Sequence, residues 1–325
     1  MDIFLGIDAG TVSFKWVLAG PAERLRELSM LGDGLIDRVS TLPDGTGIAW
    51  SRYSRVQGTP LQAARADLSR LLAITARDEI VSAAITGASS VLISEALGIP
   101  RESGFRATAA AASLLHPGIE NVFEMGGENS SYIRLSDNGG HRGIAGYETN
   151  GDCAAGTGSF LDQQASRLRY RVEDIGEVAL MADRSPRIAG RCSVFAKSDM
   201  IHAQQKGYRP EEILKGLCEA VARNFKSTIT RGRSIEGRCL FVGGVAMNDG
   251  VVSAMTEVFG LSPGELVVPE RCAWTGALGT ALLAAASGRA LDHTRLSSGL
   301  SGAGEQGNSS LPAWTRLSPE KVNFL

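Results

Sequence analysis

A strand, a glycine-containing turn and a second strand occur twice in this chain, about 118 positions apart (126 minus 8). In the first copy an apolar strand, Ile3 to Ile7, leads into a turn from Asp8 to Lys15, and a second strand, Trp16 to Leu18, follows. In the second copy the strand Asn121 to Met125 precedes a turn that begins at Gly126. This repeat predicts an internally duplicated α/β fold that holds a ligand between its two halves.

The residues of the first turn favour phosphate as part of that ligand. Asp8 at the end of a strand is expected to hold Mg²⁺ through water, and Lys15 to neutralise charge. The backbone at Gly10 and the hydroxyl groups of Thr11 and Ser13 are expected to meet phosphate oxygens. An ordinary hairpin turn uses the same residue types, so this stretch alone leaves both interpretations open.

The second turn, Gly126-Gly127-Glu128-Asn129, is the expected partner of the first, with a nucleotide between them. Gly126, Gly127 and Asn129 are predicted to bind phosphate. Glu124, on the preceding strand, is a candidate at the metal, and Glu128 is a candidate to orient an attacking water. The alternative is that both glutamates are solvated turn carboxylates.

A later glycine turn and a glycine-containing helix are candidates to bind the rest of the nucleotide. A strand from Cys239 to Val242 runs into Gly243-Gly244, and a helix is expected from Val245 with Asn248 early in it. Bare backbone at such a junction lets an adenine or a ribose approach closely, although close packing of a strand and a helix needs the same glycines. A small-residue helix that contains Gly276 is expected to permit sliding between domains.

The division into domains follows from these turns and from a break at Pro117-Gly118. Residues 1–116 and about 274–288 are expected to form one ATPase subdomain, and residues 117–273 a second one. Residues 289–325 are expected to be a flexible tail or linker, because Ser297 to Ser310 is rich in glycine and serine. The segment before Gly58 is expected to be turn-rich, with a helix from Pro60 to Ala76 after it.

Two cysteines each stand where a turn leads into a helix. Cys153 precedes Gly156 and an apolar run, and Cys192 follows 39 residues later (192 − 153 = 39). The N-terminus of a helix favours a thiolate or an anionic iron–sulfur cluster. A [4Fe–4S] cluster usually takes four thiolates, so a two-fold dimer would supply the other two. The alternative is that both are buried small hydrophobic residues, since no Cys-x-x-Cys pair is present.

Composition excludes several classes of partner. A net charge of −2 gives no support to nucleic-acid binding, and no apolar run is long enough for a membrane span. Five scattered cysteines without a secretory segment predict a reducing cytoplasm and no disulfide framework. Cys218, Cys239 and Cys272 are predicted to be core residues.

In this order, the two hairpins, the Gly243-Gly244 turn and the helix at Gly276 resemble the ribonuclease-H-like fold of the actin, hexokinase and Hsp70 superfamily of ATPases. Between them stand Cys153-Ala-Ala-Gly-Thr-Gly-Ser-Phe and Cys192-Ser-Val-Phe-Ala. With these motifs the chain resembles the ATP-dependent activators of 2-hydroxyacyl-CoA dehydratases, which are related to the ATPase subunits of benzoyl-CoA reductase. The resemblance covers roughly residues 1 to 287.

The resemblance implies a homodimer with one [4Fe–4S] cluster, held by Cys153 and Cys192 of each subunit. Hydrolysis of ATP to ADP would change the angle between the helices that start at these cysteines. A low-potential electron, supplied by a ferredoxin or flavodoxin, would then pass to an iron–sulfur dehydratase or reductase.

The chain departs from this family at the second phosphate loop. The family usually has Gly-Gly-Gln-Asp there, and this chain has Glu128-Asn129 after its two glycines. One alternative is therefore a regulatory module that binds ATP and scarcely hydrolyses it. Another is a redox-silent sugar or small-molecule kinase of the same superfamily, with Cys153 and Cys192 structural.

Overall fold

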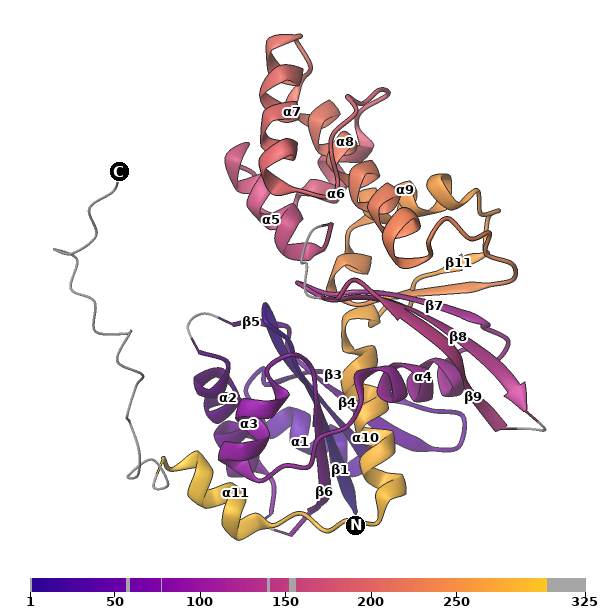
Figure 1. The fold of residues 1–325 in the computed structure, drawn as a ribbon. Helices are drawn as coiled ribbons and strands as arrows, with labels where there is room; N and C mark the ends of the chain where they lie inside the picture. The colour runs from indigo at the N-terminus through magenta and orange to yellow at the C-terminus, as the bar shows by residue number, and fades with distance from the viewer. Residues whose placement is uncertain (1, 57–58, 77, 139–140, 152–155, 303–325) are drawn as a thin grey trace, which may run out of the picture.

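The computed structural model describes residues 2–56, 59–76, 78–138, 141–151 and 156–302 (Figure 1). These residues form two sheets with helices around them, so the predicted α/β class is confirmed. One is a six-stranded sheet in the order β3 (Ile36–Thr41), β4 (Thr46–Ser51), β2 (Ser13–Pro21), β1 (Ile3–Ala9) and β6 (Ile80–Thr86), with β5 (Ser54–Arg55) paired to β2. The other is a five-stranded sheet in the order β11 (Leu266–Val267), β10 (Cys239–Val242), β7 (Asn121–Met125), β8 (Ser130–Asn138) and β9 (His141–Thr149). Each sheet contains one predicted hairpin, and we call the two halves the first and the second lobe.

The first lobe is built on β1 (Ile3–Ala9), which pairs antiparallel with β2 (Ser13–Pro21) and parallel with β6 (Ile80–Thr86). Its core contains the large apolar side chains of these strands, among them Ile7 and Trp16. Helices α2 (Pro60–Ile74) and α3 (Ser90–Leu97) add Leu68 and Ile93 to the same core.

The prediction of a turn-rich segment before Gly58 is wrong. Helix α1 (Ala22–Leu31) and the strands β3 (Ile36–Thr41), β4 (Thr46–Ser51) and β5 (Ser54–Arg55) occupy it. The apolar signal is weak because β3 lies at the edge of the sheet with polar side chains facing solvent, and α1 buries only two of its residues. Hydrogen-bond pairing to β4 therefore holds β3 in place although its sequence has little hydrophobic alternation.

The second lobe repeats the plan of the first. Its central strand β7 (Asn121–Met125) pairs antiparallel with β8 (Ser130–Asn138) and parallel with β10 (Cys239–Val242). Outside these lie β9 (His141–Thr149) and the short β11 (Leu266–Val267). The helices of this lobe are α5 (Gly158–Arg167), α6 (Ile175–Leu180), α7 (Ser193–Gln205), α8 (Pro210–Asn224) and α9 (Asp249–Phe259).

Helices α10 (Thr275–Ser287) and α4 (Gly104–Leu115) pack so closely that glycine is required at the contact. A Cβ atom at Gly279 would lie 1.7 Å from the carbonyl oxygen of Ala107. A Cβ atom at Gly6 of β1 would lie 2.1 Å from the carbonyl oxygen of Ala277. Figure 1 shows α10 running beside β1, with its N-terminus close to the second lobe. The small residues of α10 therefore serve backbone-to-backbone packing against both a strand and a helix.

The expected flexible segment from Ser297 to Ser310 is wrong for its first residues. Helix α11 (His293–Leu300) packs against α3, and a Cβ atom at Gly299 would lie 2.2 Å from the carbonyl oxygen of Ala96. The helix is stabilised by burial of Leu296 and by Asp292, whose side chain accepts a hydrogen bond from the Arg295 amide at 2.9 Å. Residues 303–310 lie outside the described residues. Across the described part of the chain, no helix has the length and apolar character to cross a bilayer.

Candidate functional site

A cavity of about 390 Å³ lies between the two lobes. Its lining comes from both hairpins and from the later glycine turns, and it contains every residue that the sequence predicted at the nucleotide. These are Asp8, Gly10, Thr11, Ser13, Lys15, Glu124, Gly126, Gly127, Glu128, Asn129, Gly243, Gly244, Asn248 and Gly276. The fold therefore gathers at one place residues that are up to 268 positions apart (276 minus 8).

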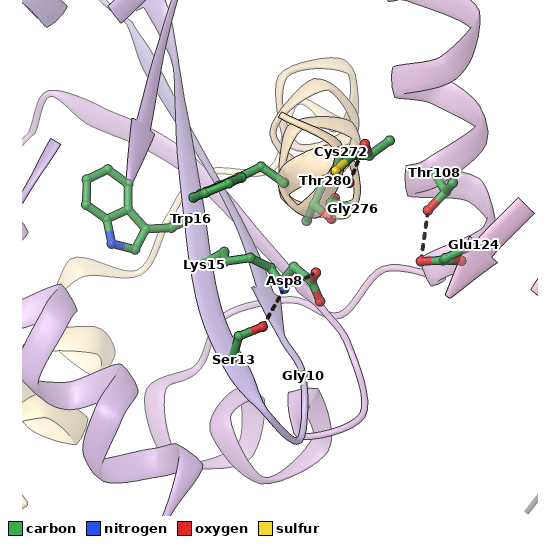
Figure 2. Close-up of polar contacts among 12 residues, drawn as sticks. Asp8, Gly10, Ser13, Lys15, Trp16, Thr108, Glu124, Cys272, Gly276 and Thr280 are labelled. Atoms are coloured by element: carbon green, nitrogen blue, oxygen red, sulfur yellow. Dashed lines mark hydrogen bonds and ion pairs between the residues drawn. The ribbon is translucent and has the colours of Figure 1, made fainter. Parts of the chain in front are cut away.

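The first hairpin presents a paired cation and anion to the cavity. Asp8 and Lys15 are opposite each other in the β1–β2 register, and Lys15 Nζ lies 3.0 Å from Asp8 Oδ2. Lys15 also donates a hydrogen bond to Ser13 Oγ at 2.9 Å, and its side chain is buried (Figure 2). The turn is closed by a hydrogen bond from the Gly10 amide to the Ser13 carbonyl. Burial and pairing hold the ammonium group of Lys15 in one position.

The first turn of α10 touches the Asp8 carboxylate. A Cβ atom at Gly276 would lie 3.3 Å from Asp8 Oδ2, so a side chain there would crowd the carboxylate. Figure 2 shows Asp8 beside the beginning of this helix, with Glu124 on a separate strand, which belongs to the second lobe. Glycine at this position leaves room around Asp8 for water or a metal ion.

Glu124 is held in the second lobe by two hydroxyl groups. Ser131, opposite it in the β7–β8 register, donates to Glu124 Oε2 at 2.9 Å, and Thr108 of α4 donates to Oε1 at 3.4 Å. Burial raises the pKa of Glu124 to about 7, and the nearby Asp8 carboxylate adds to this effect, while the two hydroxyl groups and Lys15 act against it. A carboxyl group of this kind exchanges a proton near neutral pH and becomes fully charged when a cation binds beside it.

The tips of the two hairpins meet. A Cβ atom at Gly127 would lie 2.4 Å from Val12 Cγ2, so a side chain there would displace Val12. The second turn is closed by a hydrogen bond from the Gly126 amide to the Asn129 carbonyl at 2.8 Å. Glu128 and Asn129 line the cavity beside it.

The Gly243-Gly244 turn is built much as expected, with one difference. Gly243 has a φ of +93°, and a Cβ atom there would lie 2.4 Å from the Met125 carbonyl oxygen. The residues after it form a 3₁₀ turn, Gly244–Met247, so the prediction that Asn248 lies within a helix is wrong. Asn248 instead caps α9, and its Oδ1 atom accepts a hydrogen bond from the Val251 amide at 3.0 Å. Asparagine is a preferred capping residue, and this signal could have located the start of α9.

The second hairpin also supports the beginning of α5. The amides of Gly158 and Ser159 donate hydrogen bonds to the carbonyls of Gly126 and Gly127, at 3.0 and 2.7 Å. The Thr157 hydroxyl donates to the same Gly127 carbonyl at 2.7 Å. The helix predicted after Cys153 is therefore present, whereas Cys153 itself lies outside the described residues.

Cys192 stands at the N-terminus of α7, as the sequence predicted. Its side chain is partly exposed, and the backbone N–H groups of Phe195 and Val194 lower the pKa of its thiol. Across the described ranges, no group of three or more histidine, cysteine and acidic side chains lies close enough to hold a metal ion. Cys192 therefore has a setting that favours the thiolate form.

The three other cysteines lie in the core. Cys218, Cys239 and Cys272 are each at most 3% exposed. Burial raises the pKa of the first two thiols to about 12 and that of Cys272 to about 11. These thiols stay protonated at neutral pH.

Sequence reasoning missed an ion-pair cluster at the cavity. Arg55 of β5 contacts Asp162 of α5 at 2.6 Å and Glu173 at 2.9 Å, and all three residues line the cavity. Tyr53 lines it as well and lies against Gly244. No local motif indicates these contacts, because the partners of Arg55 are 107 and 118 residues away in the sequence.

Solved structures share this architecture. Component A of the (R)-2-hydroxyglutaryl-CoA dehydratase from Acidaminococcus fermentans has a TM-score of 0.68 and 26% identity, covering 88% of this chain and 99% of that one. The activator of the 2-hydroxyisocaproyl-CoA dehydratase from Clostridium difficile, with bound ADPNP, has a TM-score of 0.69 and 24% identity, covering 95% and 100%. The predicted actin-like ATPase fold is therefore confirmed.

Comparison of sequences gives relatives of the same kind as comparison of structures. The 2-hydroxyisocaproyl-CoA dehydratase activator of Clostridioides difficile is 30% identical over 209 residues, which are 64% of this chain and 75% of that protein. The family model described as the BadF/BadG/BcrA/BcrD ATPase family matches residues 5–284. The resemblance drawn from the cysteine motifs and hairpins is thus confirmed, and the chain belongs to the BadF/BadG/BcrA/BcrD ATPase family.

Proposed function

We propose that the protein is an ATP-hydrolysing reductive activator. It passes a low-potential electron from a [4Fe–4S] cluster at a homodimer interface to an iron–sulfur enzyme of the 2-hydroxyacyl-CoA dehydratase or benzoyl-CoA reductase type. The observation that carries this proposal is the position of Cys192, partly exposed at the start of α7 with two backbone N–H groups lowering its thiol pKa. Membership of an ATPase family supports the nucleotide part.

The cavity residues divide into three groups in this proposal. The phosphates are bound by the two hairpins, through Gly10, Thr11, Ser13, Lys15, Gly126, Gly127 and Asn129. Asp8 and Glu124 hold Mg²⁺, Asp8 through water, and Glu128 orients the attacking water. The ribose and base lie against Gly243, Gly244, Asn248 and Gly276. Support for these roles comes from the shared cavity and from the buried, paired Lys15.

The cluster ligands are proposed to be Cys153 and Cys192 of each subunit. When bound, the cluster supplies one-electron transfer at low potential. The thiolate of Cys192 is favoured by the amides of Val194 and Phe195. The side chains of these same two residues are largely exposed, and adjacent exposed apolar side chains favour contact with a second subunit.

Coupling between ATP and the electron requires two arrangements of the lobes. We propose that residues 1–116 with 274–288 and residues 117–273 move as two domains, and that ATP and ADP bind the two arrangements with different affinity. Because α5 begins on the carbonyls of Gly126 and Gly127, a change at this loop moves the helix that follows Cys153. The electron donor in this scheme is a ferredoxin or flavodoxin.

The decisive experiment is anaerobic reconstitution with iron and sulfide. The parent protein is expected to be brown and to hold about one cluster, roughly four irons, per dimer. Cys192→Ala and Cys153→Ala are each expected to lose the iron while still binding ATP. Cys239→Ala, a buried cysteine outside the cavity lining, is the matched control and should keep it. A colourless parent protein with full ATPase activity would refute the electron-transfer role and favour a kinase.

The presence of Glu128 in place of the family's glutamine favours one alternative, a regulatory module that binds ATP with little turnover. Single-turnover ATP hydrolysis by the parent protein and by Glu128→Gln distinguishes this regulatory module from the proposed activator. Our proposal requires measurable hydrolysis by the parent protein. ATP binding without hydrolysis in the parent, with hydrolysis gained in Glu128→Gln, would establish the regulatory module instead.

A further inference from the structure

The ion pairs of Arg55 join the two lobes across the cavity. Arg55 lies opposite Ser13 in the β2–β5 register, so its backbone adjoins the first phosphate hairpin. Its guanidinium group reaches the second lobe, where Nη2 donates to Asp162 Oδ2 at 2.6 Å and Nη1 donates to Glu173 Oε1 at 2.9 Å. Figure 1 shows β5 on the side of the first lobe that faces the second. The contact therefore spans the cavity that both lobes line.

The far end of this contact is tied to the second phosphate loop. Asp162 is in α5, whose first residues Gly158 and Ser159 donate hydrogen bonds to the carbonyls of Gly126 and Gly127. The guanidinium group thus links the strand beside one hairpin, through α5, to the other hairpin. A movement of either lobe away from the other must break the two ion pairs.

The exposure of these side chains suits a contact that opens and closes. Arg55 and Asp162 are partly exposed and Glu173 is exposed, and ion pairs this solvated are individually weak. Burial disfavours the charged form of Arg55, but its hydrogen bonds to Glu173 and Asp162 outweigh this and raise its pKa. Arg55 therefore stays charged at neutral pH.

We propose that Arg55, Asp162 and Glu173 form a latch that holds the lobes closed over a bound nucleotide and slows its release. The latch rests on the proposed function only in requiring that the cavity binds a nucleotide. It assigns to these residues a positioning role, because they act through the arrangement of the lobes. The competing explanation is that Arg55 binds the phosphates directly and that the two carboxylates merely neutralise it.

The two explanations predict opposite effects of removing the carboxylates. If the latch is correct, Arg55→Ala and the double variant Asp162→Asn/Glu173→Gln both speed nucleotide release, because each breaks the same contact. If Arg55 binds phosphate, the double variant frees the guanidinium group for the nucleotide and slows release. The sign of the change in the double variant therefore decides between them.

The experiment measures the release rate of N-methylanthraniloyl-ADP by stopped-flow displacement. Moderate salt is used because it screens general effects of charge around the cavity. Loss of the two weak ion pairs is expected to speed nucleotide release by about three- to tenfold. Combining all three substitutions should release nucleotide no faster than Arg55→Ala alone, since the residues act as one unit. Arg24→Ala is the matched control, because Arg24 also pairs with two carboxylates, Glu27 and Glu79, but inside the first lobe.

Slower release in the double variant, or unchanged release in Arg55→Ala, would overturn the latch while leaving nucleotide binding intact. An equal acceleration by Arg24→Ala would also overturn it, because the effect would then be general. A parent protein that bound no nucleotide would overturn the proposed function together with the latch. Thermal unfolding of each variant verifies that the exposed substitutions leave the fold unchanged.

Discussion

The backbone amide of Gly158 donates a hydrogen bond to the carbonyl of Gly126 at 3.0 Å, so helix α5 begins directly on the second hairpin turn. A Cβ atom at Gly158 would lie 3.0 Å from that same carbonyl oxygen and 3.3 Å from Gly127 Cα. A side chain at position 158 would therefore crowd the backbone of this turn. Hydrogen bonds therefore join the turn that faces the first hairpin directly to the helix that follows Cys153.

The first prediction concerns Thr157, whose hydroxyl group donates to the Gly127 carbonyl at 2.7 Å. Thr157→Val keeps the shape and removes this hydrogen bond from a buried position, which should cost about 1 kcal/mol of folding stability. ATP affinity should also fall, by roughly fivefold, because the loop is less well held. Calorimetric titration with a non-hydrolysable ATP analogue measures this, and Thr157→Ser should restore affinity. Equal affinity in Thr157→Val and the parent protein would show that the hydroxyl group does not support the loop.

The second prediction concerns the pH dependence of stability due to Glu124. Its pKa is about 7 in the folded protein against an ordinary value of 4.5, so between these pH values the folded state binds more protons than the unfolded state. Stability therefore falls as pH rises from about 4.5 to 7 and then levels off. The upper limit of this loss is about 3 kcal/mol, and solvent in the open cavity reduces it.

Glu124→Gln removes this titration while keeping the size of the side chain. The variant should match the parent protein near pH 5 and exceed its free energy of unfolding by about 1 to 3 kcal/mol at pH 8. Urea unfolding at both pH values, with chelator present to exclude divalent cations, gives the comparison. A difference that stayed constant from pH 5 to pH 8 would show that Glu124 has an ordinary pKa.

The two hairpins could be predicted from sequence because their signal is local. A strand, a glycine turn and a strand lie within about twenty residues, and β-pairing between neighbours in the chain needs no distant information. The ion pairs of Arg55 are different, since their partners are over a hundred residues away. The edge strand β3 gives no such local signal, because Ile36 is the one buried residue in it, and pairing to β4 defines the strand instead of apolar alternation.

In the candidate site too, features that depend on residues far apart in the chain could not be predicted from local sequence. Nothing near Gly276 in the sequence indicates that a Cβ atom there would lie 3.3 Å from Asp8 Oδ2, because the two residues are far apart in the chain. The composition of helix α11 predicts a linker, because most of its side chains are polar or small. Its position depends on Leu296 and on the close approach of Gly299 to Ala96, contacts that composition does not describe.

The third prediction concerns the packing of α10. Gly279→Ala places a methyl group 1.7 Å from the Ala107 carbonyl oxygen and 2.3 Å from its carbonyl carbon, and this backbone of α4 leaves it no room. The helices must separate, and the loss of stability should be about 3 kcal/mol or more. Gly143→Ala is the control, because a Cβ atom there meets nothing within 4 Å. Thermal unfolding of the two variants tests this, and similar midpoints would show that α4 and α10 are not in close contact.

The fourth prediction concerns the order in which thiols of the metal-free protein react with iodoacetamide. Cys192 is partly exposed, with a thiol pKa lowered by the Phe195 and Val194 amides, whereas Cys218, Cys239 and Cys272 are buried with raised pKa values. Because the thiolate is the nucleophile and must be reached by the reagent, Cys192 should be alkylated at least about 100-fold faster than these three. Peptide mass mapping over a time course gives the rates, and the three slow thiols should react at the rate of global unfolding when urea is added. Reaction of Cys218 or Cys239, which lie outside the cavity lining, as fast as Cys192 in the native protein would show that the core is open. Protection of Cys192 after reconstitution with iron and sulfide would then connect this sulfur directly to the proposed cluster.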